Sequence, residues 1–264
     1  MLFLTPVITI YILVMAFIFG AVFASFLGCM GWRITTGESV LKGRSHCDYC
    51  GHVLAWRDLI PIVSFVVGKG RCAYCKKTLS KTLLYGELSL ALLFVLVTLR
   101  YDVTPELFLY LFFVCILYLI SITDIYDKMI PDSAIIIAII VRILWFLITE
   151  PFQVIRLLGL VGNGLSVSLP LLLLVLLMEK IRGMEMMGGG DIKLLFVMGM
   201  YLGWANNLLA LFAGCLTAII YGLIMQKRKG EEVYIPFGPF LALGAVFALL
   251  LEDGLIQWYL SLFY

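Results

Sequence analysis

Long hydrophobic runs separated by short polar stretches dominate the chain. A helix needs about 20 apolar residues to cross a bilayer core of roughly 30 Å, and eight runs approach or exceed that length. Backbone amides in lipid must be hydrogen-bonded internally, so these runs are predicted to be helices. The predicted fold is an all-α polytopic membrane protein with about eight transmembrane helices. The runs cover residues 5–30, 83–99, 106–123, 133–149, 157–178, 192–204, 207–225 and 236–251, of which 192–204 is the shortest.

Composition supports the same class of protein. Of the 264 residues, 63% are hydrophobic and 14% are charged, and the mean hydropathy is +1.08, which lies outside the range of soluble domains. The expected partner is the lipid bilayer, and no nucleic-acid partner is expected. Met1 is not followed by a basic segment or a small-residue cleavage site, so the first run is predicted to be a retained helix.

Lysine and arginine predict the orientation, because cytoplasmic loops carry an excess of both. With the N-terminus outside and eight spans, all but three of the 19 lysines and arginines fall on the cytoplasmic side; the exceptions are Arg100, Arg142 and Arg156. The C-terminus is then also outside. The sequence therefore predicts an N-out, C-out protein.

Residues 33–82 form the one sizeable polar region. Two Cys-x-x-Cys pairs lie in it, and 21 residues separate them. Such spacing favours a zinc ribbon, in which four thiolates surround Zn²⁺ and the metal stabilises a loop too small for a good core. We predict a first transmembrane helix at 1–32, a cytoplasmic zinc-binding loop domain at 33–82 and a membrane core at 83–264. The predicted ligands are Cys47, Cys50, Cys72 and Cys75.

Disulfide bonds are the alternative for these cysteines, although a cytoplasmic location disfavours them. His46 and His52 flank the first pair as alternative ligands, but a simple loop role fits them better. The three other cysteines lie in apolar runs and are interpreted as packing residues: Cys29, Cys115 and Cys215.

Two polar stretches beside predicted spans carry aspartates, and a carboxylate beside a membrane helix is first interpreted as functional. Asp124 ends the third span, where the helix dipole disfavours a negative charge. Asp132 and Asp191 precede apolar runs, where an acidic N-cap is the structural alternative. Asp127 is interpreted as a solvated loop charge.

The residue types favour acid–base hydrolysis. Two carboxylates that share a proton can activate water and protonate a leaving amine. The chain has no His-Glu-x-x-His, Gly-x-Ser-x-Gly or Walker sequence, and a metalloprotease or serine hydrolase is therefore disfavoured. A carboxylate-dependent ion transporter stays open as an alternative, although the internal repeat typical of transporters is not found.

Taken together, these motifs resemble the type IV prepilin peptidases, a family of membrane aspartic peptidases also called leader peptidase/N-methyltransferases. The resemblance covers residues 24–33, 44–50 and 58–61, both cysteine pairs and Glu87. It also includes an Asp-x7-Asp sequence with proline before the second aspartate, and a Gly-x-Gly-Asp-x-Lys sequence. These two motifs correspond to Asp124, Asp132, Gly188, Gly190, Asp191 and Lys193.

The resemblance implies that Asp124 and Asp191 are the catalytic pair. It implies prepilin or pseudopilin substrates, cleaved at the cytoplasmic face of the bacterial inner membrane. Another class of intramembrane peptidase is the near alternative. The family also methylates the new N-terminus with S-adenosylmethionine, and Glu87 marks a possible cofactor region. Because the chain departs from the family pattern at Ala24, Gly28 and Leu83, the sequence does not predict whether methyl transfer is retained.

Overall fold

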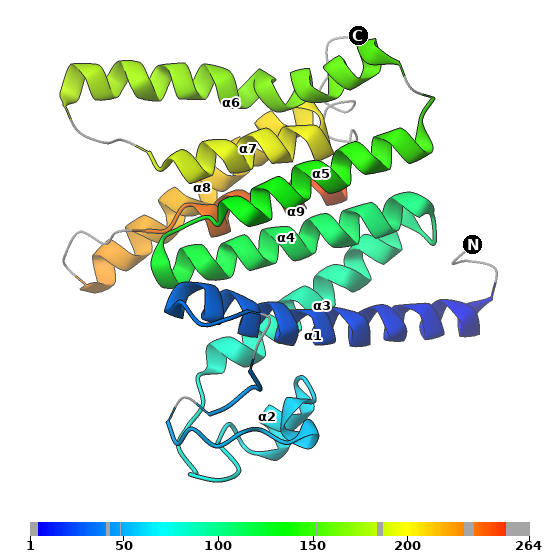
Figure 1. Cartoon of the computed structure of the whole chain (residues 1–264), viewed down its shortest axis with the longest axis vertical. Coiled ribbons are helices and arrows are strands. Elements are labelled where there is room, and N and C mark those ends of the chain that lie inside the picture. The colour runs from blue at the N-terminus through cyan, green and yellow to red at the C-terminus, as the bar shows by residue number, and fades with distance from the viewer. Residues whose placement is uncertain are drawn as a thin grey trace. The chain divides into compact units, whose positions relative to one another are not determined.

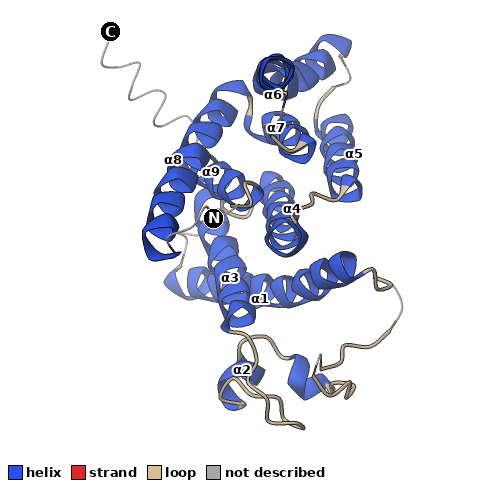
Figure 2. Ribbon diagram, turned by 90° about the vertical axis from the view of Figure 1, so that its left-hand side faces the viewer, coloured by secondary structure: helices blue, strands red, loops and turns tan. Residues whose placement is uncertain are grey.

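The computed structural model describes residues 5–40, 43–47, 49–151, 153–183, 187–229 and 235–251. These residues form helices and loops, and their only β-structure is two isolated antiparallel bridges (Figures 1 and 2). The all-helical prediction is therefore confirmed. The helices are α1 (Pro6–Thr36), η1 (Trp56–Leu59), α2 (Val63–Val67), α3 (Lys81–Tyr101), α4 (Pro105–Asp127), α5 (Asp132–Thr149), α6 (Val154–Arg182), α7 (Gly189–Leu202), α8 (Trp204–Lys229) and α9 (Gly238–Leu251).

Each of the eight predicted hydrophobic runs corresponds to a helix. Among the described residues, six helices are long and apolar enough to cross a membrane: α1, α3, α4, α5, α6 and α8. Helices α7 and α9 have 14 residues each, or about 21 Å at 1.5 Å per residue, which is shorter than a bilayer core. The structure thus supports an integral membrane protein with six candidate spans, and a total of eight crossings stays a prediction.

Helix ends lie beyond several of the hydrophobic runs. Helix α1 continues to Thr36, where Gly37 adopts a φ of 73° and its N–H donates to the carbonyl of Arg33. This is a glycine C-cap, a conformation that residues with a Cβ rarely adopt. Helix α7 ends before Gly203, which has a φ of 79° and lets α8 begin at the next residue.

The chain forms two compact units, Met1–Tyr126 and Asp127–Tyr264. The first contains α1, α3, nearly all of α4 and the loop with the cysteines. Helices α1 and α3 approach closely at Gly20, where an added Cβ would lie 2.7 Å from the Cα of Ala91. The rings of Phe23 and Phe94 stack beside this contact. Small residues at helix crossings are typical of membrane bundles. The division into residues 1–32, 33–82 and 83–264 is not tested by these two units and stays a prediction.

Helix α7 lies at the centre of the second unit and contacts α5, α6, α8 and α9 (Figure 2). Its close approach to α6 depends on Gly199, whose added Cβ would overlap the backbone of Asn163 and Gly164. Seven of its 14 residues are buried. Half of this short helix is therefore buried in protein.

Two long-range hydrogen bonds attach the C-terminal end of α7 to α5. Arg142 Nε donates to the carbonyl of Met200 at 2.9 Å, and the Tyr201 hydroxyl donates to the carbonyl of Ala138 at 2.8 Å. The last carbonyls of a helix have no partner within that helix, so Arg142 satisfies one that would otherwise end in an apolar environment. This contact accounts for the presence of a charged residue, Arg142, within a predicted transmembrane run.

Candidate active site and cysteine cluster

Asp124 lies in the last turn of α4 and is buried, as is the preceding Thr123. Asp127, three residues further along, is exposed. The two carboxylates thus differ in burial, and the roles assigned to them stay predictions. A buried carboxylate at the C-terminal end of an apolar helix has no structural role as an N-cap, because N-caps occur at the opposite end.

Asp191 lies in the first turn of α7 and is half-buried. Its N–H donates to the carbonyl of Gly188 at 3.1 Å, and one of its carboxylate oxygens lies 3.4 Å from where a Cβ on Gly188 would be. The carboxylate is therefore at the positive end of the α7 dipole. Gly188 is the N-cap residue, so Asp191 is not itself the N-cap that the structural alternative expected. Asp132 is likewise in the first turn of α5, after the N-cap Pro131.

Residues from both aspartate motifs meet in the second unit. Lys193 Nζ lies 2.6 Å from Asp132 Oδ1 and joins α7 to α5. Gly190 packs against Ile130, since an added Cβ would lie 3.0 Å from the Ile130 Cβ. The segment that precedes α5 is thus held against the first turn of α7. Asp124 belongs to the first unit and Asp191 to the second, so the catalytic pairing of these two residues stays a prediction.

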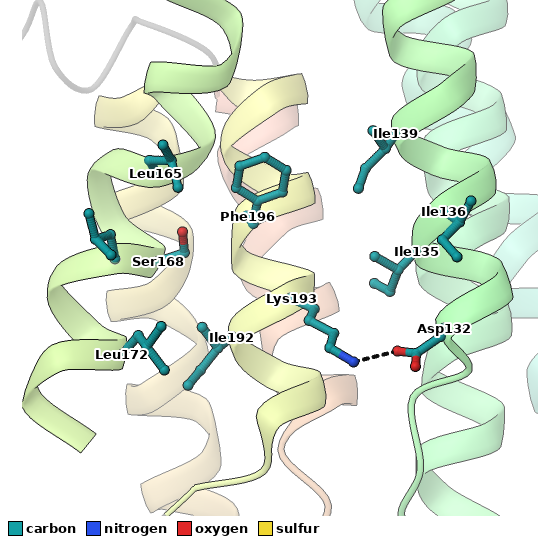
Figure 3. A pocket seen from close by; sticks show the side chains of 11 residues that line it. Asp132, Ile135, Ile136, Ile139, Leu165, Ser168, Leu172, Ile192, Lys193 and Phe196 are labelled. Atoms are coloured by element: carbon teal, nitrogen blue, oxygen red, sulfur yellow. Dashed lines mark hydrogen bonds and ion pairs between the residues drawn. The ribbon is translucent and has the colours of Figure 1, made fainter. Parts of the chain in front are cut away.

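An apolar groove of about 460 Å³ lies beside this ion pair (Figure 3). Helices α5, α6 and α7 all contribute side chains to it. Asp132 and Lys193 are its only charged residues, and the Ser168 hydroxyl is engaged by the carbonyl of Gly164 at 2.8 Å. Asp191 does not line the groove, which is therefore a separate feature. The remaining lining residues are Ile135, Ile136, Ile139, Leu165, Leu169, Leu172, Ile192 and Phe196.

The sequence did not predict the groove or the partner of Lys193. Its isoleucines and leucines recur at helical spacing on α5 and α6, which indicates a face on each helix. No local pattern shows that these two faces lie beside each other.

The two cysteine pairs lie in two similar turns in the first unit. Cys47 N–H donates to the carbonyl of His52 at 3.0 Å, and Cys72 N–H donates to that of Lys77 at 2.9 Å. Each turn is closed by one of the antiparallel bridges. The two turns thus have the same hydrogen-bond pattern, as predicted for a pair of chelating hairpins.

The turns point their thiols toward one another. All four cysteine sulfurs lie within 4.8 Å of one another, and the Sγ atoms of Cys47 and Cys75 are 3.9 Å apart. A disulfide requires about 2.05 Å, whereas the edge of a tetrahedron with Zn–S bonds of about 2.3 Å measures about 3.8 Å. All seven cysteines have free thiols. The geometry fits a tetrahedral metal and does not fit the disulfide alternative.

Backbone groups prepare one of these thiols for metal binding. The N–H groups of Cys75 and Tyr74 lower the pKa of the Cys72 thiol from 9.0 to about 7. The backbone of His52 lowers the pKa of Cys50, but desolvation and the neighbouring cysteines raise it to about 11 overall. A nearby cation would favour the thiolate form of Cys50 and so oppose the increase in its pKa.

The histidines are not part of this group. His52 packs its ring on Tyr74, with centroids 3.6 Å apart, and His46 Nδ1 lies 3.4 Å from the carbonyl of Arg44. The Tyr74 hydroxyl donates to Asp58 at 3.0 Å, which raises the pKa of this tyrosine. Asp58 also accepts from the N–H of Ala55. This carboxylate therefore ties residues 55–58 to the second cysteine turn.

Glu87 is half-buried in α3 and contacts the loop that carries the cysteines. Its Oε2 accepts a hydrogen bond from the N–H of Ile62 at 2.6 Å, and Ser25 of α1 also bonds to it. Helix α4 approaches this position through Tyr118, whose hydroxyl would lie 2.5 Å from a Cβ on Gly86. Sequence reasoning linked Glu87 to a cofactor and missed its contact with Ile62.

These features define a polytopic helical membrane protein with carboxylates at two helix ends and a cysteine cluster suited to zinc. The chain belongs to the type IV leader peptidase family. Residues 18–101 match the bacterial peptidase A24 N-terminal domain, and residues 111–223 match the type IV leader peptidase family itself. The recognition made from the sequence is therefore confirmed.

Several relatives are named prepilin leader peptidase/N-methyltransferase. The relative from Bacillus subtilis is 32% identical over 253 residues, which cover 93% of this chain and 97% of that protein. The relative from Pseudomonas aeruginosa is 32% identical over 225 residues, or 82% of this chain and 74% of that protein. The relative from Legionella pneumophila is 30% identical over 227 residues, which cover 83% of this chain and 76% of that protein. No solved structure matches the chain.

Proposed function

We propose that this chain is a membrane aspartic endopeptidase that removes the leader peptide of type IV prepilins or pseudopilins. The observation that carries the proposal is the contact between the two aspartate motifs in the second unit. Gly190, next to Asp191, packs against Ile130. Ile130 lies between Asp124 and Asp132 in the first aspartate motif. The family match and the names of the relatives support the same activity.

In the proposed reaction, Asp124 and Asp191 share one proton. A carboxylate at the positive end of α7 is suited to carry the negative charge, so Asp191 takes a proton from water as the water oxygen attacks the scissile carbonyl carbon. Asp124, at the opposite end of its own helix, donates a hydrogen bond to that carbonyl oxygen. When the tetrahedral intermediate collapses, the C–N bond breaks and the amine nitrogen takes a proton from the pair.

Lys193, Asp132 and the glycines act around this pair. Lys193 and Asp132 hold the first turn of α7 against α5, while Gly188 and Gly190 allow close approach to the Asp191 carboxylate and to Ile130. We assign all four residues a positioning role in the peptidase motif.

Cys47, Cys50, Cys72 and Cys75 would hold one structural Zn²⁺. The metal would supply charge neutralisation for four close thiolates and would fix the two turns relative to each other. None of the proposed hydrolytic steps involves this metal.

We propose the bacterial cytoplasmic membrane as the location, with eight crossings and both termini outside. The basic residues of the inter-helix loops support this orientation. A substrate with a basic leader and a hydrophobic helix would then present its scissile bond at the cytoplasmic face.

N-methylation of the new N-terminus with S-adenosylmethionine is a further proposed activity, supported by the names of the relatives. The region near Glu87, whose Oε2 accepts a hydrogen bond from the N–H of Ile62, stays the proposed place for this cofactor.

A cleavage assay tests the peptidase proposal. Membranes containing the full chain are mixed with a prepilin, and products are separated by mass. Asp124→Asn and Asp191→Asn should each abolish cleavage at unchanged protein level, whereas the exposed Asp127→Asn should process normally. Near-normal processing by either of the first two variants would reject the proposed pair.

A further inference from the structure

Part of the cysteine-containing loop exposes a run of apolar side chains. It extends from Leu59, the last residue of η1, through α2 to Val67, and this stretch contains no charged residue. Val66 and Val67 are 60% and 77% exposed, and Val63 is also exposed. Phe65 instead packs under Gly70. Soluble domains rarely expose such a continuous apolar patch without a partner.

The contact with Glu87 places this segment at membrane depth. In α3, the basic residues Lys81 and Arg100 are 19 positions apart, or about 28 Å at 1.5 Å per residue. This matches a bilayer core of roughly 30 Å, so the two residues mark the two interfaces. Glu87 is six positions from Lys81 and therefore lies about 9 Å inside. The Ile62 N–H donates to the Glu87 carboxylate, which leans toward the N-terminal end of α3, so Ile62 lies at a depth between Lys81 and the Glu87 backbone.

Backbone hydrogen bonding in the segment also suits lipid, where no water satisfies exposed amides. Ser64 N–H donates to the carbonyl of Ile60 at 3.0 Å, and Val66 N–H donates to that of Ile62 at 3.0 Å. Val63 N–H donates to the carbonyl of Pro61 at 2.6 Å, and Pro61 itself has no N–H. Ile62, whose N–H has no carbonyl partner at the turn, is satisfied by the Glu87 carboxylate.

Ile62 adopts a φ of 63° and a ψ of −51° at the centre of a three-residue γ-turn, a positive-φ conformation that is a genuine outlier for a β-branched residue. Such strain persists only where the surroundings enforce it. The hydrogen bond from Ile62 to Glu87 supplies that constraint and turns the chain toward α2.

Basic residues lie at the two ends of the apolar run. Arg57 precedes it and stacks 5.2 Å from the ring of the exposed Trp56, while Lys69 and Arg71 follow it. Aromatic and basic side chains are typical of the membrane–water interface, where anionic headgroups attract the positive charges. This arrangement complements a lipid surface.

We propose that residues 59–67 form a re-entrant segment inserted into the bilayer leaflet next to the cysteine turns, held there by Glu87. Lipid acyl chains cover Val63, Val66 and Val67. The loop between α1 and α3 is then divided into a water-exposed part with the cysteines and a lipid-embedded part. The proposal does not depend on peptidase activity.

Fluorescence quenching of the full chain in lipid nanodiscs tests this insertion. A genetically encoded fluorescent amino acid replaces Val66 in one variant and, as a matched control, Tyr49 in another. Tyr49 is 57% exposed on the first cysteine turn. Lipids brominated on their acyl chains should quench the probe at position 66 at least twofold more than the probe at 49. Aqueous iodide should show the opposite preference.

Equal quenching of both probes by iodide, without quenching by brominated lipid, would overturn the insertion. Iodide quenching at 66 that disappears only when a prepilin is added would assign the surface to the substrate and would also overturn it.

The Glu87 contact is tested in the same assay. Glu87→Gln keeps an oxygen acceptor for the Ile62 N–H and should retain quenching by brominated lipid at position 66, whereas Glu87→Ala should lower it at least twofold. Unchanged quenching in Glu87→Ala, in protein that elutes as a single species, would overturn the role of Glu87.

Discussion

Lys193 Nζ and Asp132 Oδ1 lie 2.6 Å apart and connect the N-terminal parts of α7 and α5, although the two residues are 61 positions apart in the chain. Both side chains are more than half exposed. Exposed ion pairs typically contribute only about 0.2–1 kcal/mol to stability, so this pair matters chiefly for the position of α7. Because Asp191 lies two residues before Lys193 in α7, the ion pair also fixes the position of Asp191.

We expect Lys193→Met and Asp132→Asn each to lower kcat/KM for prepilin cleavage about tenfold, which corresponds to about 1.4 kcal/mol, while the unfolding temperature stays nearly constant. The physical reason is loss of the contact that positions Asp191. The exchanged pair Asp132→Lys with Lys193→Asp should recover part of the activity. Lys180→Met, an exposed lysine at the end of α6, is the control and should cleave normally. Equal activity in all variants would remove the positioning role.

Arg142 holds the other end of α7, and its removal should affect stability more. Arg142→Met leaves the Met200 carbonyl without this donor, and an unsatisfied buried acceptor costs about 1–3 kcal/mol. We expect a lower unfolding temperature in detergent and reduced cleavage. Arg156→Met provides the control, because Arg156 pairs with Glu150 at an exposed site. A larger effect from Arg156→Met than from Arg142→Met would contradict the assigned role.

Hydrophobic runs were sufficient to locate the six long apolar helices of the described residues and the two shorter ones, α7 and α9, because a helix satisfies its own backbone in an apolar environment. Helix ends were less predictable. Gly37 and Gly203 end their helices with positive φ angles, and only the structure shows which glycines adopt them. The cysteine cluster could be predicted from the spacing of the two Cys-x-x-Cys pairs, because each pair lies within one short turn.

Contacts between distant residues could not be predicted. The Arg142–Met200 and Ile62–Glu87 hydrogen bonds join positions 58 and 25 residues apart. Sequence periodicity identifies a helix face but not its partner. The aspartates were identified because carboxylates near membrane helices are rare, whereas the Ile130–Gly190 contact has no sequence signal.

The cysteine cluster predicts pH-dependent metal binding. The ordinary pKa of 9.0 for Cys72 falls to about 7 in the folded loop, so its thiolate stabilises the fold fully above about pH 9 and loses that effect as the pH falls through about 7. Protons also compete with zinc for all four thiolates. Elemental analysis should therefore find about one zinc per chain at pH 8 and clearly less after dialysis against chelator at pH 5.5.

Cys75→Ser should lose zinc already at pH 8, because it removes one of four ligands. Cys215→Ser, in α8 and outside the cluster, should keep it. Zinc-free wild-type protein at pH 8 would reject the metal assignment.

The three glycines before Asp191 provide the closest test of the motif contact. A Cβ on Gly190 would lie 3.0 Å from the Cβ of Ile130 and 3.3 Å from its Cγ1, tighter than ordinary van der Waals contact, whereas a Cβ on Gly189 would meet nothing within 4 Å. We expect Gly190→Ala to push the segment before α5 away from Asp191 and to lower cleavage about tenfold, or about 1.4 kcal/mol in the activation barrier.

Gly189→Ala is the matched control and should cleave normally, with equal or slightly higher stability because alanine favours the helix. Ile130→Ala removes the Cγ1 and Cδ1 atoms that crowd the new methyl group, so the double variant Gly190→Ala with Ile130→Ala should recover part of the lost activity. Cleavage rates in membranes, normalised to protein level, provide the measurement. If Gly189→Ala were as damaging as Gly190→Ala, flexibility of the glycine run would explain the motif, and the packing against Ile130 would not.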